Sequence, residues 1–408
     1  MNKKSDVVIV GAGHAGAACA SALRKLNFPG SILVIGAEPE LPYERPPLSK
    51  AYLADTKRFE DLLIHPGSLW QERNIEFMLD TVVNTVDSEQ HCVITDAGEI
   101  VHYSTLVWAT GGAPRQLRCQ GSDLQGVHSI RTRADADRIK ADMAHVEHAV
   151  IIGGGYIGLE AAAALATLGK QVTLIEALDR VLARVAGADL AHFYESEHRA
   201  HGVDIRLSSA VESIEGHDRV TGVLLTSGEV IKADMVIVGI GIIPATHALT
   251  AAGAAGENGV LVDLHCRTSL PDVLAIGDCA LHPNLFAEGQ LLRIESVQNA
   301  NDQAAVAAKT ICGDLVEYRK IPWFWSDQYD LKLQTVGLSA GFDDTVVRGD
   351  PSLRSFSVIY LRNGKVIALD CVNAMKDYVQ GKRLVMEGAS VAPEVLSDTS
   401  IYLKDIPH

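Results

Sequence analysis

The sequence predicts an α/β protein with two similar βαβ units and a smaller C-terminal α+β domain. Three observations lead to this prediction. A short apolar run followed by the pattern Gly-x-Gly-x-x-Gly occurs twice, at residues 7–16 and 149–158. After about residue 320 the pattern changes to short alternating segments, which is typical of antiparallel strands. With 408 residues, the chain is also longer than a single core normally grows.

The first unit begins with a buried strand over 7–10 and a glycine turn, followed by a helix over about 14–26 and a strand over 32–35. The first glycine of such a turn bends the chain tightly. The second lets a pyrophosphate approach the backbone, and the third lets helix and strand pack closely. The free N–H groups that begin the helix attract the diphosphate. Dinucleotide binding is therefore predicted at Gly11, Gly13 and Gly16.

Glu38 lies at the end of the second strand, about 25 residues past the glycines. A carboxylate at that point can accept a hydrogen bond from a ribose hydroxyl, and the alternative is a solvated loop acid. The loop that follows, Pro42 to Lys50, contains three prolines, which fix φ and stiffen it. Such rigidity suits a segment that holds a side chain against a ligand.

The second unit repeats this plan, with a strand over 149–152, a helix over about 156–168 and a strand over 172–176. The pattern Gly-x-Gly-x-x-Gly alone is weak evidence for dinucleotide binding, but a strand before it and a helix after it make it specific. The glycine positions are taken by Gly153, Gly155 and Gly158. Two dinucleotide sites in one chain suggest two cofactors that face one another, as hydride transfer between them requires.

Glu176 ends the second strand of this unit, about 20 residues past its glycines. A carboxylate there hydrogen-bonds a 2′-hydroxyl group and repels a 2′-phosphate, so NADH is favoured over NADPH. Arg180 and Arg184 follow closely and would weaken that preference.

The remaining segments indicate that the second unit is inserted into the first. Residues 105–112 form a buried strand and a glycine turn that leave the first unit, and 235–244 close the second. The strand at 273–278 then resumes the first unit, and an Ala-rich helix runs from about 297 to 311. The predicted domains are 1–112 with 242–320, 113–241, and 321–408.

The C-terminal domain is predicted from a strand at 332–336 and a hairpin over 356–361 and 366–371. The hairpin turns at Asn363-Gly364, a dipeptide that suits a two-residue turn. A helix is expected near 376–387. Strands followed by a helix make this a separate α+β domain.

Composition restricts the possible partners. A net charge of −15 argues against nucleic acid or an anionic membrane as the main partner. No apolar run reaches the roughly 20 residues of a membrane span, and the chain starts directly in a strand, so the cytoplasm is the expected compartment. The seven cysteines include no Cys-x-x-Cys or Cys-x4-Cys pair, which predicts neither a zinc site nor a redox disulfide.

With these motifs, the chain resembles the FAD-dependent, NADH-using ferredoxin reductases of bacterial oxygenase systems over essentially its whole length. The resemblance rests on Arg45-Pro46-Pro47-Leu48-Ser49-Lys50, Ala109-Thr110-Gly111-Gly112, residues 153–160, Ala275-Ile276-Gly277-Asp278-Cys279-Ala280 and residues 322–329. The first motif separates this family from the disulfide reductases, which carry a redox cysteine pair after that loop. The resemblance implies a glutathione-reductase-like arrangement of two Rossmann-like domains.

The resemblance implies that FAD occupies the first glycine site. Asp278 would hydrogen-bond the ribityl chain, and Val297 would bring helix N–H groups near the flavin N1/O2 edge. Trp325 would lie near the exposed flavin edge, although an isolated tryptophan is more often a core residue. The implied FAD contacts are Gly11, Gly13, His14, Ala15, Gly16, Glu38, Arg45, Lys50, Val83, Ala109, Thr110, Gly111, Arg131, Gly277, Asp278, Val297 and Trp325.

The second site would hold NADH, and Tyr156 would be its nicotinamide gate or, alternatively, a packing aromatic. The implied catalytic pair is Lys50, beside the flavin N5, and Glu160, which keeps that lysine charged and oriented. Each residue alone could be a surface charge. The implied NADH contacts are Gly153, Gly155, Tyr156, Ile157, Gly158, Glu160, Glu176, Arg184 and Gly241.

By the same resemblance, electrons pass from NADH through FAD to a [2Fe–2S] ferredoxin that serves a Rieske dioxygenase or a haem monooxygenase, as in aromatic hydrocarbon catabolism. Basic groups such as Arg293, Lys309 or Arg319 would dock the ferredoxin. The alternatives are a rubredoxin, quinone or oxygen reductase, and a flavoprotein of the apoptosis-inducing-factor type with a binding role. Disulfide reduction is disfavoured by the missing cysteine pair.

Overall fold

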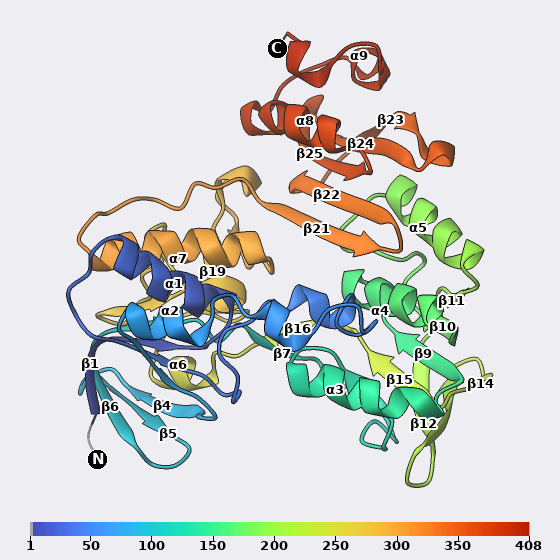
Figure 1. Cartoon of the computed structure of the whole chain (residues 1–408). Coiled ribbons are helices and arrows are strands. Elements are labelled where there is room, and N and C mark those ends of the chain that lie inside the picture. Colours follow the sequence, from blue (N-terminus) through green and yellow to red (C-terminus); the bar gives the residue numbers. More distant parts are fainter. Residues whose placement is uncertain (1–2, 408) are drawn as a thin grey trace. The chain divides into compact units, whose positions relative to one another are not determined.

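The computed structural model describes residues 3–407, which form two compact units (Figure 1). Unit 1 consists of Met1–Glu44, Phe59–Ala113 and Ile243–Pro322, and unit 2 consists of Arg45–Arg58, Pro114–Ile242 and Trp323–His408. The sequence division placed residues 45–58 with the first dinucleotide-binding domain, whereas in the structure they pack with unit 2. The finer division into three domains stays a prediction.

Unit 1 is built on a seven-stranded sheet in the order β3-β2-β1-β6-β5-β4, with β18 beside β6. Its strands are β1 (Lys3–Val10), β2 (Ile32–Ile35), β3 (Ile75–Met78), β4 (Val83–Asp87), β5 (Cys92–Thr95), β6 (Ile100–Trp108) and β18 (Val273–Ala275). The β1, β2, β3, β6 and β18 strands run parallel, and the pairing of β18 with β6 confirms that the chain resumes this sheet.

Both faces of the central strand β1 are buried, which explains its uninterrupted apolar sequence. Val7 and Ile9 belong to one core cluster, and Val8 and Val10 belong to the other. The helices α1 (His14–Lys25) and α7 (Val297–Ile311) cover the first face and lie side by side (Figure 1). The remaining elements of unit 1 are α2 (Gly67–Glu72), α6 (His247–Ala251), β17 (Val260–Leu261), β19 (Ala280–Pro283), β20 (Leu291–Leu292) and the 3₁₀ turns η2 (Phe59–Leu62), η4 (Gly277–Cys279) and η5 (Leu285–Ala287).

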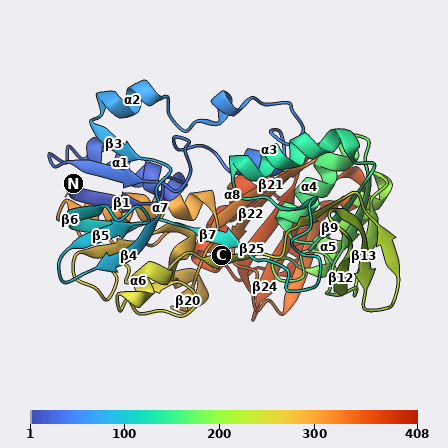
Figure 2. The same ribbon diagram turned by 90° about the horizontal axis from the view of Figure 1, so that it is seen from below.

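Unit 2 contains a parallel sheet in the order β11-β10-β9-β15-β8. On one face it packs against the small sheet β12-β13-β14, and α4 contacts β9 and β10 (Figure 2). The elements of this part are β8 (Val127–Ser129), α3 (Arg133–Asp142), η3 (Met143–His145), β9 (His148–Ile152), α4 (Tyr156–Thr167), β10 (Gln171–Ile175), α5 (Ala188–Ala200), β11 (Asp204–Arg206), β12 (Val211–Gly216), β13 (Val220–Leu225), β14 (Val230–Lys232) and β15 (Met235–Val238). The chain passes between the units at β7 (Gly112–Pro114) and β16 (Ile242–Pro244).

Unit 2 also contains a five-stranded antiparallel sheet in the order β21-β22-β25-β24-β23, against which α8 packs. The predicted hairpin is confirmed, and its turn residues Asn363 and Gly364 have φ of 51° and 71°. A two-residue turn with positive φ at both positions matches the twist of the strands it joins. The elements are η1 (Pro46–Ser49), β21 (Trp323–Gln328), β22 (Leu331–Gly337), β23 (Asp344–Asp350), η6 (Pro351–Leu353), β24 (Ser355–Arg362), β25 (Lys365–Val372), α8 (Met375–Glu387), α9 (Pro393–Ser397) and η7 (Leu403–Asp405). Within residues 3–407, no helix has the length and apolarity that a membrane crossing requires.

A buried carboxylate lies in this C-terminal sheet. Asp370 on β25 is 4% exposed and accepts a hydrogen bond from the Tyr360 hydroxyl at 2.6 Å. The same hydroxyl accepts the N–H of Gly187, which precedes α5, at 3.0 Å. Burial raises the pKa of Asp370 to about 7. The folded chain therefore keeps a proton here that the unfolded chain releases near pH 4.

This proton makes stability depend on pH. Because the pKa of Asp370 is higher in the folded state, its favourable contribution is complete at low pH and is lost as pH rises through about 7. Asp370→Asn, which still accepts from Tyr360, should therefore lose less stability than the unsubstituted chain between about pH 4 and pH 7, by up to about 4 kcal/mol. Urea unfolding followed by circular dichroism measures the difference. Asp327→Asn, at an exposed position of the same sheet, is the control, and parallel pH curves for Asp370→Asn would contradict the prediction.

Candidate functional site

The first glycine turn has the close packing that its sequence predicts. Gly11 has a φ of +117°, and a Cβ there would lie 2.2 Å from the Ala109 carbonyl oxygen. A Cβ on Gly16 would lie 1.9 Å from the carbonyl oxygen of Gly11. The helix α1 begins at His14 and Ala15 behind Gly13, which has no side chain with which to cap it. Its first N–H groups thus form the anion-binding end that a diphosphate requires.

Two more predicted segments of unit 1 lie at the same edge of the sheet. Because β1, β6 and β18 are parallel, the residues that follow each of them meet at the carboxyl edge. The Thr110 hydroxyl donates to the Ala245 carbonyl at 2.7 Å, and the Gly277 N–H donates to Gln303 Oε1 at 2.7 Å. The predicted flavin residues gathered there are Gly11, Gly13, His14, Ala15, Gly16, Ala109, Thr110, Gly111, Gly277 and Asp278.

Glu38 follows β2 at this edge, and its carboxylate accepts a hydrogen bond from the Tyr43 hydroxyl. The N–H of Asp80 donates to the Glu38 carbonyl at 3.0 Å, and the N–H of Thr81 donates to the Gly36 carbonyl at 2.9 Å. These bonds hold the segment that leads to Val83 beside the Glu38 loop. Val83 itself is 8% exposed.

The start of α7 is supported by a buried polar network that the sequence reasoning missed. Val297 is the first residue of the helix, and the Ser296 hydroxyl caps it by accepting the Asn299 N–H at 3.0 Å. Gln303 lies two turns along the helix. Its side-chain carbonyl accepts the Gly277 N–H, and its amide nitrogen donates to His282 Nδ1 at 3.1 Å. Burial lowers the pKa of His282 to about 4, so the ring is neutral. A glutamine in an Ala-rich helix gives no sequence signal for this role.

The second glycine turn repeats the geometry of the first in unit 2. Gly153 has a φ of +108°, and a Cβ there would lie 2.5 Å from the Gly239 carbonyl oxygen. A Cβ on Gly158 would lie 2.0 Å from the carbonyl oxygen of Gly153. At Gly155 an added Cβ would meet no heavy atom within 4 Å. The middle glycine therefore faces open space, as the approach of a pyrophosphate requires.

The carboxylate of Glu176 is fixed beside this turn. Its Oε2 accepts the Gly154 N–H at 2.7 Å, and its Oε1 accepts the Leu178 N–H at 2.9 Å. Arg184 is exposed. Gly241, with a φ of +95°, accepts the Arg115 N–H at 2.9 Å.

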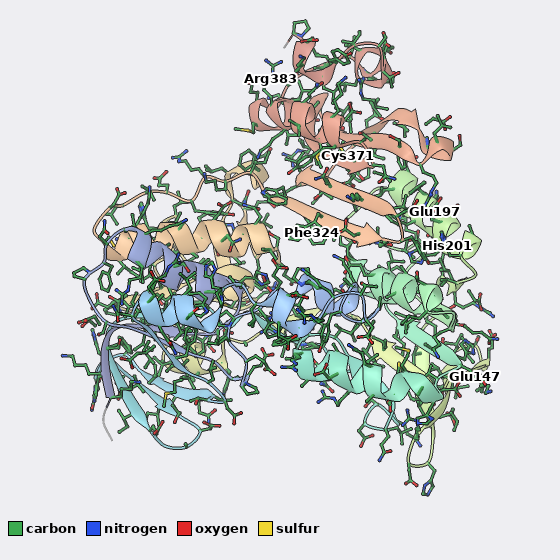
Figure 3. The ribbon with its side chains drawn as sticks, viewed as in Figure 1. Glu147, Glu197, His201, Phe324, Cys371 and Arg383 are labelled. Atoms are coloured by element: carbon green, nitrogen blue, oxygen red, sulfur yellow. The ribbon has the colours of Figure 1, made fainter. Side chains whose placement is uncertain are left out.

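Tyr156 and Ile157 begin α4. The Tyr156 ring lies 4.7 Å from the ring of Phe324 on β21, between centroids, whereas Ile157 is 45% exposed. Trp325 follows Phe324 and is half-buried, with a centroid distance of 6.3 Å between the two rings. Tyr156 at the start of α4 and Trp325 on β21 are therefore both neighbours of Phe324, which Figure 3 labels.

Lys50 and Glu160 form an ion pair, with 3.0 Å between Nζ and Oε1. Their side chains are 15% and 5% exposed. The Glu160 carboxylate also accepts the Ser49 hydroxyl at 2.7 Å and the Ser326 hydroxyl at 2.6 Å. Burial raises the pKa of Glu160, while Lys50 and the two hydroxyls oppose that rise. The resemblance predicted the pair, but the two serines, from distant segments of the chain, were missed.

Arg45 and Arg131 are also in contact, since the Arg45 guanidinium donates to the Arg131 carbonyl at 2.7 Å. Together with Lys50 and Trp325 they belong to unit 2, whereas the other predicted flavin residues belong to unit 1. The assignment of these four residues, and of the others, to the flavin stays a prediction.

Arg293 is wrong as a docking residue. It is 9% exposed, donates to the Asp278 carbonyl at 3.0 Å and pairs with Glu295 at 2.6 Å. Its charge is therefore used inside unit 1. Lys309 and Arg319 are 41% and 63% exposed and pair with Asp314 and Glu317.

All seven cysteines lie among the described residues and are free, and five of them are buried. Burial raises the pKa of Cys279, beside Asp278, to about 11. Between Cys19 and Cys92 the chain has no cysteine, so no thiol follows the Lys50 loop. Among residues 3–407, no group of three or more His, Cys, Asp or Glu side chains could hold a metal ion.

Known proteins share this architecture along the whole chain. The pyridine nucleotide-disulphide oxidoreductase family matches residues 5–304, and the reductase C-terminal family matches residues 323–407. A ferredoxin–NAD(P)(+) reductase from Sphingomonas is 59% identical over 98% of this chain and 97% of its own. The ferredoxin reductase subunit of the 5,5′-dehydrodivanillate O-demethylase from Sphingobium is 56% identical over 98% of both chains.

The solved structure of putidaredoxin reductase in covalent complex with putidaredoxin has a TM-score of 0.94 and 38% identity, covering 98% of this chain and 97% of that one. The sequence similarity and the shared fold agree with the two glycine turns and the α+β C-terminal sheet. The chain belongs to the ferredoxin reductases of the pyridine nucleotide-disulphide oxidoreductase family.

Proposed function

We propose that this enzyme uses FAD to carry electrons from NADH to a [2Fe–2S] ferredoxin of an oxygenase system. In the overall reaction one NADH and two oxidised ferredoxins give NAD⁺, one proton and two reduced ferredoxins. The observation that carries the proposal is the buried Lys50–Glu160 pair, in which the glutamate comes from the helix of the second glycine turn. The helix that begins at the proposed nicotinamide site therefore also carries the carboxylate that pairs with Lys50, the charge proposed to act in hydride transfer.

Unit 1 fits FAD. The tight turn at Gly11 and the N-terminus of α1, which has no side-chain cap, suit its diphosphate, and Glu38 suits its adenosine ribose. Asp278 and the start of α7 are held at the same edge by the Gln303 network. When bound, FAD accepts a hydride from NADH and releases the two electrons one at a time. The protein's proposed part is to hold and orient the cofactors and to supply electrostatic stabilisation.

Lys50 is the residue proposed to favour hydride arrival. Its ammonium group is mostly withdrawn from water, and the carboxylate 3.0 Å away pairs with it and orients it. A fixed positive charge in a site of low dielectric stabilises electron density that arrives beside it.

Lys50→Met should reduce kcat/KM for NADH by about 10²-fold, because it removes this charge and leaves Glu160 unpaired. The rate at which NADH reduces the bound flavin in stopped-flow experiments measures the effect. Lys232→Met, at an exposed position of the same unit, is the control. An unchanged rate for Lys50→Met would remove this residue from the proposed mechanism.

Glu176 is proposed to select NADH. The two backbone N–H groups that hold its carboxylate fix a negative charge where a 2′-phosphate would lie. Arg184 is exposed and Arg180 is paired with Asp179.

Glu176→Ala should lower the ratio of kcat/KM for NADH to that for NADPH by about tenfold or more, since it removes both a ribose acceptor and a repulsive charge. Steady-state kinetics with the two nucleotides measures the ratio. Glu212→Ala, an exposed acid in the same unit, should leave the ratio unchanged. If NADPH is used no better by Glu176→Ala, the selection lies elsewhere.

The ferredoxin as acceptor is supported by the relatives' names and by the putidaredoxin complex of one of them. The terminal oxygenase is a Rieske dioxygenase or a haem monooxygenase, and the two are distinguished by testing which of them the reduced ferredoxin supplies with electrons. Steady-state NADH oxidation with a [2Fe–2S] ferredoxin, a rubredoxin, a quinone or oxygen as acceptor tests the proposal. Ferredoxin should give the fastest turnover, and equal turnover with oxygen would reject it.

A further inference from the structure

A chain of four hydrogen bonds within unit 2 ends on the Glu160 carboxylate. The Tyr329 hydroxyl lies 3.0 Å from His198 Nδ1, and His198 Nε2 lies 2.9 Å from Gln328 Oε1. The Gln328 amide nitrogen is 3.2 Å from the Ser326 hydroxyl oxygen, which is 2.6 Å from Glu160 Oε1. Ser326, Gln328 and His198 are each at most 1% exposed, so water does not compete for these contacts.

The chemistry of the partners gives all four bonds the same direction. Gln328 Oε1 can only accept, so His198 Nε2 carries the hydrogen and Nδ1 accepts from Tyr329. Burial lowers the pKa of His198 to about 4, which keeps this ring neutral. The Gln328 amide nitrogen can only donate, so a lone pair of Ser326 is occupied and its hydrogen points to Glu160. Hydrogen bonds aligned in this way polarise one another.

Alternation along β21 produces this arrangement. Ser326 and Gln328 point into the protein, whereas Asp327 between them is exposed. His198 reaches the strand from α5, near Glu197 and His201, which Figure 3 labels. The ring of His201 stacks on Tyr329 at 3.7 Å between centroids and covers the outer end of the chain.

We propose that Ser326, Gln328 and His198 are positioning residues that keep Glu160 ionised and directed at Lys50. The importance of this for catalysis rests on the function proposed above. The C-terminal sheet thus sets the charge state of a residue on the helix of the NADH site. Its three residues act through Glu160 and need not touch either cofactor.

Other ionisable groups also act on this carboxylate. Among the described residues they are Lys50 from the η1 segment, Tyr156 from α4 itself and Tyr194 from α5. Both tyrosines are neutral, because burial raises the pKa of each above its ordinary value. Lys50 is therefore the charge, and the serine hydroxyls are the dipoles, that oppose the burial of Glu160.

Infrared pH titration of the holoenzyme tests the proposal. The protonated-carboxyl band that is missing from Glu160→Gln reports this group alone. Ser326→Ala should raise its pKa by about one unit, because a hydrogen bond to a charged group is lost. Gln328→Met and His198→Phe, which interrupt the chain at different links, should each raise it by less. Gln380→Met, a half-buried glutamine of α8, should leave it unchanged.

The two interrupting variants keep the test decisive if one of them does not fold. The proposal is overturned if the folded variant or variants leave the pKa of Glu160 where the unsubstituted enzyme has it. The pH profile of flavin reduction by NADH supplies a second measurement. Gln328→Met should shift that profile upward only when Glu160 is present, whereas a purely structural defect would lower the rate equally in the Glu160→Gln background. Failure to reduce ferredoxin would reject the proposed function but would leave the infrared result standing.

Discussion

The burial of one carboxylate, Glu160, is the constraint around which unit 2 is organised. An unpaired charge removed from water would cost several kcal/mol or would take up a proton. Here the cost is offset by Lys50 and by the hydroxyls of Ser49 and Ser326. These partners come from two segments, which lie far from each other and from α4 in the sequence. The carboxylate can be satisfied only when the Lys50 loop, α4 and β21 are all in place.

The two glycine turns show how one local solution is adapted to two ligands. In both, the first and third glycines are required by carbonyl oxygens that leave no room for a Cβ. The carboxylates that follow them differ in their support. Glu38 accepts from a tyrosine hydroxyl of its own loop, whereas Glu176 is held by backbone N–H groups, one of which belongs to the glycine turn itself. A carboxylate bound to the turn moves with it, which suits the discrimination of a nucleotide.

The sequence predicted the strands, the glycine turns and the C-terminal hairpin well, because each depends on a local pattern or on a positive φ. It could not place Ser326, Gln328 or His198 at Glu160, since these contacts are made between distant segments and leave no periodic signal. For the same reason it did not indicate the partner of Ser49: nothing in Pro46-Pro47-Leu48-Ser49 shows that this hydroxyl will bond to a helix residue more than 100 positions away. Arg293 was misjudged as a docking group because charge is visible in a sequence and burial is not.

The hydrogen bond between Ser326 and Glu160 has a consequence for how such enzymes can be recombined. The boundary between the two family matches falls between residues 304 and 323, so donor and acceptor of this bond lie in segments that look exchangeable. In a chimaera that joins the nucleotide-binding part of one relative to the C-terminal part of another, the glutamate would keep Lys50 and Ser49 but would receive the partner at position 326 from a different protein. Modularity in this fold is therefore limited by a few buried polar atoms rather than by the backbone.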